Sequence, residues 1–246
     1  MADDLSDWTQ GSFTHGDLTH ETFRKGSGPG VIVIHEVPNI YPKVIHFGNE
    51  VVDAGFTVVM PSLFGKPGAP LTKTSPLTAI ARGCVNREFT VWATNKTSPI
   101  ATWLRALAKD LHEQIGGPGV GAIGMCFTGG FALAMMVEKH TVAPVLSQPS
   151  LPFAIPRTDK GGNLGLDPAD LAAVKASDCP VMGLRYTGDP AVGTRFDTLR
   201  RELGDRFLAV EFPGKKHSVL TEHRQQEGVD RVLAFLHERL DDTAAG

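Results

Sequence analysis

The chain has 246 residues, of which 41% are hydrophobic and 21% are charged. This length and balance are typical of a globular protein and exclude a wholly disordered chain, and we expect a single domain over residues 1–246. A formal net charge of -3 argues against a nucleic-acid partner or an anionic membrane surface, because both require a concentrated basic surface. No apolar run reaches the ~18 residues that cross a bilayer.

Three cysteines, Cys84, Cys126 and Cys179, form neither a CxxC pair nor a zinc-binding spacing. A disulfide framework is therefore not expected, and a reducing compartment is the simpler interpretation. The acidic amino terminus lacks the apolar core of a secretory signal. We expect a cytoplasmic protein, in which the glycosylation sequon at Asn95 is not used. Cys84 and Cys179 have no reactive context and are expected to be inert packing residues.

Local patterns predict alternating strands and helices. Residues 1–25 are polar and are expected to form an edge hairpin or an arm, whereas the β-branched run at 31–34 is typical of a strand buried on both faces. Residues 61–97 are irregular and rich in Pro, Gly and Thr, which indicates a lid-like excursion. The other predicted elements, in chain order, are a helix over 42–54, a strand over 56–60 stopped by Pro61, a helix over 99–115, a strand over 120–125, a helix over 129–138, a strand over 141–146, a short helix from Asp167-Pro168, a strand over 180–186, a helix over 194–204, a strand over 207–212 and a helix over 223–240.

This alternation predicts an α/β fold with a mostly parallel central sheet and helices on both faces. In such a sheet, catalytic groups gather at the carboxyl ends of the strands. The chemistry is therefore expected in the segments that directly follow each strand.

The most informative of these segments is Gly124-Met125-Cys126-Phe127-Thr128-Gly129-Gly130, where a buried strand turns directly into a buried helix. This is the pattern of a strand–nucleophile–helix elbow, with Cys in place of the more usual Ser. Small residues permit the tight turn, and the helix amino terminus favours a thiolate at Cys126. The N–H of Phe127 becomes a candidate oxyanion donor. The alternative is that Cys126 is a small buried residue between strand and helix.

A nucleophile of this kind needs a base, and the base needs an acid that orients it. In elbow enzymes the acid and then the base follow the nucleophile along the chain, each after a late strand. The strand over 180–186 leads to Asp189 and the strand over 207–212 leads to His217, so we predict Asp189 as the acid and His217 as the base. The alternatives, which lie before a strand or in or near a helix, are Asp178, Asp197 and His223.

The segment His35-Glu36-Val37-Pro38 follows the first buried strand, where an elbow enzyme places its second oxyanion donor. We predict the N–H of Val37, because Pro38 has none. Glu36 would then lie near Cys126, where its carboxylate could accept the thiol hydrogen; the alternative is a surface or salt-bridged glutamate. An HExxH zinc motif would need His at position 39, where Asn39 stands, so no metal site is expected.

Residues 119–124 match the GxGxxG fingerprint of dinucleotide-binding proteins. That fingerprint must follow a strand and open a helix, whereas here it forms the strand itself. Its glycines are better explained by close packing of helices against a central strand. We therefore expect no nucleotide and no other cofactor.

The order of these motifs resembles the dienelactone hydrolase family of α/β-hydrolases over about residues 25–240. The resemblance is carried by His35-Glu36-Val37, the Cys126 elbow, Gly188-Asp189-Pro190 and Lys216-His217-Ser218. It implies an α/β-hydrolase fold, a triad of Cys126, His217 and Asp189, a partner for the resting thiol at Glu36, and oxyanion donors at the amides of Val37 and Phe127. Candidate substrate contacts within 61–97, with solvated or packing roles as the alternative, are Arg82, Arg87 and Trp92.

Together these features predict a hydrolase of small esters or lactones that forms a covalent acyl-thioester on Cys126. A thioesterase or another acyl hydrolase is an alternative with the same chemistry. An alternative from a different class is a non-catalytic or redox-sensing protein in which Cys126 is an oxidisable thiol. The expected partner is a small-molecule ester or lactone, and the chain is expected to be a monomer or a homodimer.

Overall fold

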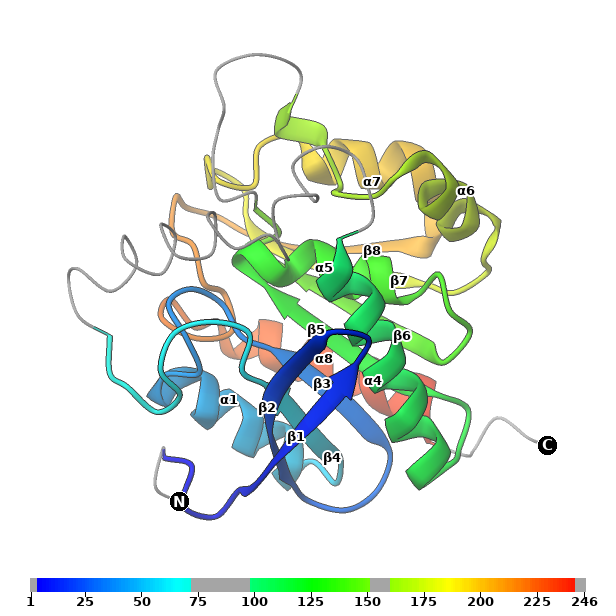
Figure 1. Ribbon diagram of the computed structural model, residues 1–246. Helices are drawn as coiled ribbons and strands as arrows, with labels where there is room; N and C mark the ends of the chain where they lie inside the picture. The colour runs from blue at the N-terminus through cyan, green and yellow to red at the C-terminus, as the bar shows by residue number, and fades with distance from the viewer. Residues whose placement is uncertain (1–3, 72–97, 151–159, 242–246) are drawn as a thin grey trace.

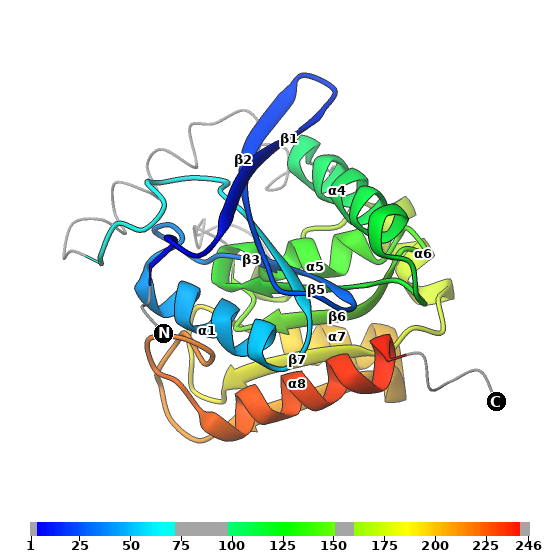
Figure 2. The ribbon, with the colours of Figure 1, turned by 90° about the horizontal axis from the view of Figure 1, so that it is seen from below.

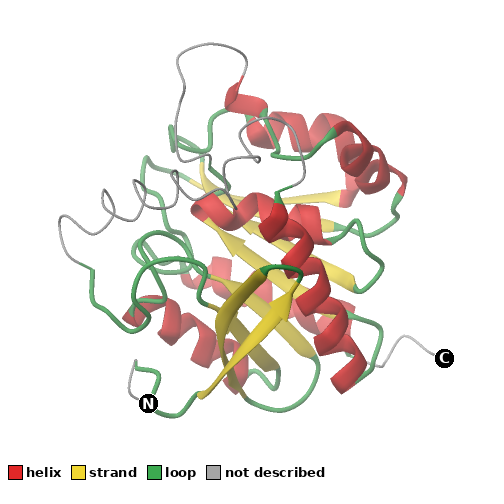
Figure 3. Ribbon diagram, viewed as in Figure 1, coloured by secondary structure: helices red, strands yellow, loops and turns green. Residues whose placement is uncertain are grey.

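The structure is a computed structural model that describes residues 4–71, 98–150 and 160–241. Its strands are β1 (Thr9–His15), β2 (Leu18–Lys25), β3 (Gly30–Ile34), β4 (Thr57–Pro61), β5 (Val120–Met125), β6 (Thr141–Ser147), β7 (Val181–Tyr186) and β8 (Phe207–Phe212). They form one sheet in the order β1-β2-β4-β3-β5-β6-β7-β8, which Figure 3 shows in yellow. The pairs β1–β2 and β2–β4 are antiparallel, and the other neighbours are parallel. The mostly parallel sheet confirms the predicted α/β architecture (Figure 1).

Helices cover both faces of this sheet. Within the described ranges, the α-helices are α1 (Pro42–Asp53), α4 (Pro99–Ile115), α5 (Gly129–Met135), α6 (Pro168–Ala176), α7 (Arg195–Leu203) and α8 (Gln226–Leu240), and the shorter 3-10 turns are η2 (Cys126–Thr128), η3 (Lys160–Gly162) and η4 (Gly204–Arg206). The helices α1 and α8 pack on one face, and α4, α5, α6 and α7 pack on the other (Figure 2). No helix in the described ranges is both long and apolar enough to span a bilayer.

Strand β3 shows why a continuous apolar run was needed in the sequence. Val31 and Val33 belong to the hydrophobic cluster under α1 and α8, whereas Ile32 and Ile34 belong to the cluster under the other helices. Successive side chains of a strand point to opposite faces, so a strand covered on both sides must be apolar at every position.

Several predicted elements are confirmed with their boundaries. The amino-terminal residues form the β1–β2 hairpin at one edge of the sheet. Helix α4 spans Pro99–Ile115 as predicted, and the Ser98 hydroxyl caps it by accepting a hydrogen bond from the N–H of Ala101. Asp167 caps α6 in the same way through the N–H of Asp170.

Several boundaries differ from the prediction by one or more residues, and three of these differences have a clear physical reason. Pro61 lies inside β4, where it pairs only with β2, because the pairing of β4 with β3 ends at Val59. Helix α5 ends at Met135, because the chain turns there towards β6. The N–H of Glu138 donates to the carbonyl of Met135 and closes this turn. Helix α8 begins at Gln226, because the preceding residues turn back on the loop after β8: the N–H of Gln225 donates to the carbonyl of Val219.

The close approach at Gly124 allows β5 to run directly into the elbow. A Cβ atom at this position would lie 2.3 Å from the carbonyl oxygen of Thr128 and 2.9 Å from the Cα of Gly129. Both are backbone atoms and cannot move aside without opening the turn. Position 124 therefore tolerates only glycine.

We predict that Gly124→Ala destabilises the protein by about 1–3 kcal/mol or more, because overpacking a fixed backbone costs that amount. The matched control is Gly11→Ala on the exposed strand β1, where a new Cβ would meet only the Thr22 hydroxyl at 3.5 Å. Urea denaturation of both variants measures the difference. An unchanged midpoint for Gly124→Ala would contradict this account of the elbow.

Candidate functional site

Cys126 stands on the turn between β5 and α5, with its backbone in the left-handed region at a φ of +56°. The side chain of Thr128 fixes this turn. Its hydroxyl accepts a hydrogen bond from the N–H of Met125 at 3.0 Å and lies 3.0 Å from the carbonyl oxygen of Ile34 at the end of β3. The chain at Cys126 is thus held against two neighbouring strands, and the thiol is presented at the carboxyl edge of the sheet.

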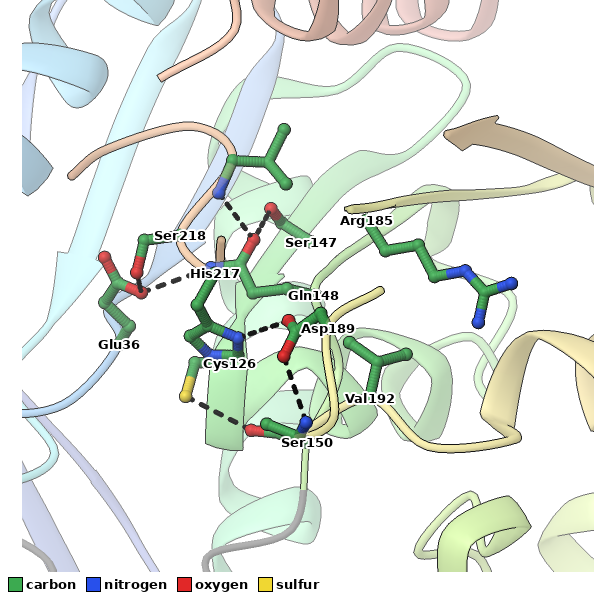
Figure 4. A network of polar contacts seen from close by, with 12 residues as sticks. Glu36, Cys126, Ser147, Gln148, Ser150, Arg185, Asp189, Val192, His217 and Ser218 are labelled. Atoms are coloured by element: carbon green, nitrogen blue, oxygen red, sulfur yellow. Dashed lines mark hydrogen bonds and ion pairs between the residues drawn. The ribbon is translucent and has the colours of Figure 1, made fainter. Parts of the chain in front are cut away.

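The two residues predicted as acid and base meet at the same edge. Asp189 follows β7 and His217 follows β8, and Asp189 Oδ2 lies 2.5 Å from His217 Nδ1 (Figure 4). Asp189 is buried, and its Oδ1 accepts a hydrogen bond from the N–H of Ala191 at 3.0 Å. The Cys126 sulfur lies within 4.8 Å of a ring nitrogen of His217. The structure therefore brings Cys126, His217 and Asp189 together from three distant segments.

The surroundings of His217 favour the protonated ring. Burial by itself would lower the pKa of the imidazole. The hydrogen bond to Asp189 and the neighbouring Cys126, with the charges of both, outweigh that effect and raise the pKa to about 10. The His217 ring is therefore mostly protonated at neutral pH.

Ser150, from the segment after β6, also contacts the sulfur. Its Oγ lies 3.2 Å from Cys126 Sγ, and its N–H donates to the carbonyl of Cys126 at 3.0 Å. The sequence reasoning missed Ser150. The carboxyl-end rule that selected Asp189 and His217 applies equally to the end of β6 and could have indicated it.

Glu36 is buried beside Cys126 and His217, with 2% of its surface exposed. Its carboxylate lies within 4.8 Å of both the thiol and the imidazole, measured between the ligating atoms. Two hydrogen bonds are donated to each carboxylate oxygen. The donors are the Tyr41 hydroxyl (2.5 Å) and the Thr221 hydroxyl on Oε1, and the Gln148 amide (3.1 Å) and the Ser218 hydroxyl (2.8 Å) on Oε2. The Glu36 side chain that the sequence placed near Cys126 is therefore close to it but already fully hydrogen-bonded.

Burial fixes the protonation states of two groups beside Glu36, Tyr41 and His35. Burial and the charge of Glu36 raise the pKa of the Tyr41 hydroxyl, so this group remains a donor. Burial lowers the pKa of His35 to about 4, which keeps that ring neutral. His35 Nε2 accepts a hydrogen bond from the N–H of Leu63 at 3.1 Å, so its Nδ1 is the nitrogen that donates to the carbonyl of Glu36.

Among the described residues, Glu36, Cys126 and His217 form the group whose spacing could hold a metal ion. Thiolate, imidazole and carboxylate are ligands that suit zinc. A carboxylate offers about four lone-pair positions, and four donors occupy those of Glu36. An ion at this place would therefore have to displace one of those hydrogen bonds.

The two predicted oxyanion donors lie beside the elbow. Phe127 directly follows Cys126 in η2, and Val37 lies in the segment after β3. This segment contacts the elbow, because the Thr128 hydroxyl also lies 3.2 Å from the carbonyl oxygen of His35. The Phe64 ring packs against the rings of both His35 and Phe127, with centroids 4.4 and 6.1 Å apart.

The remaining candidates from the sequence lie elsewhere. Asp178 is exposed ahead of β7, and Asp197 pairs with Arg200 on the surface of α7. His223 lies in the turn before α8, where its carbonyl accepts the Tyr186 hydroxyl at 2.5 Å. Three candidate substrate contacts and one cysteine fall outside the described residues: Arg82, Arg87, Trp92 and Cys84.

The raised pKa of His217 predicts how stability depends on pH. A folded-state pKa of about 10 exceeds that of an unfolded imidazole, about 6.5, so the folded chain binds more protons between these values. The stabilisation is fully present below pH about 6.5 and is lost as the pH rises through about 10. Asp189→Asn removes the largest raising contribution and is expected to flatten this fall in the free energy of unfolding.

Urea denaturation between pH 6 and 10 measures the slope for the wild type and for Asp189→Asn. The control is Asp178→Asn, which removes an exposed carboxylate just before β7. It is expected to keep the wild-type slope. Equal slopes for all three proteins would mean that Asp189 does not set the protonation of His217.

The comparisons with known proteins agree with this geometry. The sequence matches the model of the dienelactone hydrolase family over residues 19–236. No curated protein matches the chain. The family match spans the Cys126 elbow and the loops that carry Asp189 and His217.

Solved structures of dienelactone hydrolases and of other enzymes have a similar fold. The dienelactone hydrolase from Anabaena variabilis ATCC 29413 aligns with a TM-score of 0.64 at 16% identity, over 95% of this chain and 99% of that chain. A dienelactone hydrolase-like promiscuous phosphotriesterase from metagenomic libraries gives 0.65 at 17%, over 95% and 98%. The thioesterase domain from the curacin biosynthetic pathway gives 0.58 at 12%, over 94% and 99%. These identities show the shared fold, and the family match shows the relationship: the chain belongs to the dienelactone hydrolase family of hydrolases and has the α/β-hydrolase fold.

Proposed function

We propose that this chain hydrolyses small carboxylic esters or lactones with Cys126 as the nucleophile, His217 as the general acid and base, and Asp189 as the group that orients His217. The observation that carries the proposal is the grouping of Cys126, His217 and Asp189, in which the sulfur lies within 4.8 Å of the imidazole and the imidazole bonds to the Asp189 carboxylate. These side chains come from three separate loops at one edge of the sheet, and a purely structural cysteine needs no such arrangement.

The first half-reaction acylates the sulfur. His217 holds the proton that leaves the thiol, and the sulfur attacks the carbonyl carbon of the substrate. The N–H groups of Val37 and Phe127 stabilise the oxyanion, and removal of one such donor costs about 3–4 kcal/mol in comparable enzymes. When the intermediate collapses, the C–O bond breaks and His217 gives its proton to the leaving oxygen, which leaves an acyl-thioester on Cys126.

The second half-reaction releases the acid. His217 takes a proton from a water molecule, which attacks the thioester carbonyl through a second oxyanion. Collapse of this intermediate breaks the C–S bond and releases the acid, and His217 returns its proton to the sulfur to regenerate the thiol. Asp189 holds the imidazole in one orientation through both steps, because it bonds to Nδ1 and leaves the other nitrogen facing the sulfur.

Sulfur chemistry restricts the substrate and the compartment. A thiolate is itself a good leaving group, so the tetrahedral intermediate proceeds to product only when the alcohol leaves comparably well. Activated esters such as enol esters and enol lactones therefore suit the site better than amides. A thiol nucleophile also has to remain reduced, which fits a cytoplasmic location.

We predict that Cys126→Ala abolishes ester turnover, with a loss on the order of 10³-fold or more in kcat, because no nucleophile remains. The assay is release of p-nitrophenol from short-chain esters, followed by a panel of lactones and thioesters. One equivalent of iodoacetamide is expected to inactivate the wild type in parallel with its incorporation.

The matched control is Cys179→Ala, which removes a partly buried cysteine whose thiol donates to the carbonyl of Val142 away from the site. It is expected to keep wild-type turnover and wild-type sensitivity to iodoacetamide. Full activity in Cys126→Ala would contradict the nucleophile. Stoichiometric labelling of a wild type that turns over no member of the panel would contradict the enzyme.

A further inference from the structure

We propose that Gln148 is a positioning residue for His217. Its side-chain amide bonds both to the buried carboxylate of Glu36 and to the loop after β8 that carries His217, which we call the base loop. The inference rests on the proposed function in that it treats His217 as the base. Gln148 acts through the loop and not on the substrate. Its role is therefore to hold the imidazole in register with the sulfur.

Gln148 is itself held in an unusual conformation. It directly follows β6, is fully buried, and has a φ of +35°. Its N–H donates to the carbonyl of Leu184 in β7 at 2.7 Å, which fixes the backbone on that side. A non-glycine residue in the left-handed region is strained and persists only where its surroundings determine it. Here the conformation directs the side chain towards the base loop.

The two ends of the Gln148 amide meet partners of opposite kind (Figure 4). Its Nε2 donates to Glu36 Oε2 at 3.1 Å, and its Oε1 accepts the N–H of Val219 at 3.1 Å. The Ser147 hydroxyl also donates to Oε1. A carboxylate only accepts and a backbone N–H only donates, so the position requires a side chain with a donor at one end and an acceptor at the other. Glutamine meets this requirement and ionised glutamate does not.

The same carboxylate binds the base loop at two further points. Ser218, which directly follows His217, donates to Glu36 Oε2 at 2.8 Å and has a φ of +35°. Thr221, one turn further on, donates to Oε1. The residues that follow His217 are thus fixed by three hydrogen bonds, two to Glu36 and one to Gln148.

The imidazole is thus positioned in two ways, by its bond to Asp189 and by this network. Asp189 fixes the ring at Nδ1, and the backbone just beyond His217 is fixed by Glu36 and Gln148. The His217 side chain is 26% exposed, so surrounding contacts alone do not restrict it fully. A displacement of about 1 Å in a catalytic group can cost about 100-fold in rate, so loss of either hold is expected to reduce turnover.

The test uses two substitutions that change the amide differently. Gln148→Met keeps the length of the side chain and removes all three hydrogen bonds of the amide. We expect kcat to fall about 10- to 100-fold with KM within about threefold of the wild type, because substrate binding is not touched. The rate of Cys126 alkylation by iodoacetamide at neutral pH is expected to change with kcat, since it reports the same imidazole–sulfur contact.

Gln148→Glu gives the sharper readout. When ionised, the new carboxylate faces Glu36 and can donate to nothing, whereas when protonated it donates to Glu36 and still accepts from Val219. Two facing carboxylates share a proton at elevated pH. The ratio of Gln148→Glu to wild-type kcat is therefore expected to rise as the pH is lowered from 9 to 5, while the ratio for Gln148→Met stays flat.

The control is Thr141→Val, which removes a buried hydroxyl at the opposite end of the same strand and is expected to leave both assays unchanged. If Gln148→Met does not fold, as judged by circular dichroism, Ser218→Ala removes a single donor from the network and is expected to lower kcat and the alkylation rate by several-fold.

Wild-type behaviour of the Gln148 variants at every pH, or a Gln148→Glu profile without acid recovery, would overturn the inference. The alkylation assay needs no substrate, so these outcomes remain distinguishable from a wild type that hydrolyses no ester.

Discussion

A cysteine held at a φ of +56° is the constraint from which the rest of the site follows. This backbone conformation costs on the order of 1–3 kcal/mol for a non-glycine residue and persists only because neighbouring atoms fix it. Thr128 binds the turn to β5 and β3, and Gly124 permits the approach that any Cβ atom would prevent. The same turn places the thiol at the edge where the loops after β6, β7 and β8 also arrive. The strain and the site therefore have a single structural origin.

Two buried carboxylates lie near the imidazole of His217, and their hydrogen-bonding partners differ. Asp189 pairs with the ring itself, whereas four neutral donors saturate Glu36. A buried carboxylate without such partners would be protonated or strongly destabilising. The donors on Glu36 come from three loops, so the requirement to solvate one buried charge also fixes the relative positions of those loops. The charge thereby becomes a structural element of the site.

The sequence predicts the elements that depend on local pattern. The elbow follows from glycine spacing and strand context, and the paired loops at Asp189 and His217 follow from their places after late strands. Gln148 and Ser150 were missed because nothing in a Ser-Gln-Pro-Ser segment separates a buried polar network from a surface loop. Their importance depends on the order of strands in the sheet, which places β6 beside β5. The start of α8 was missed for a related reason, since contacts with Ser218 and Val219 hold residues 223 and 225 in a turn.

The charges also explain why sulfur suits this position better than oxygen. A serine hydroxyl is a weak acid that needs a neutral imidazole at the moment of attack. Asp189 and Cys126 raise the pKa of His217 to about 10 against the opposing effect of burial, so the ring is mostly protonated at neutral pH. A thiol is acidic enough to give its proton to such a ring before the substrate arrives. In the proposed reaction, a ring that is protonated in this way would already carry the proton that the leaving oxygen needs.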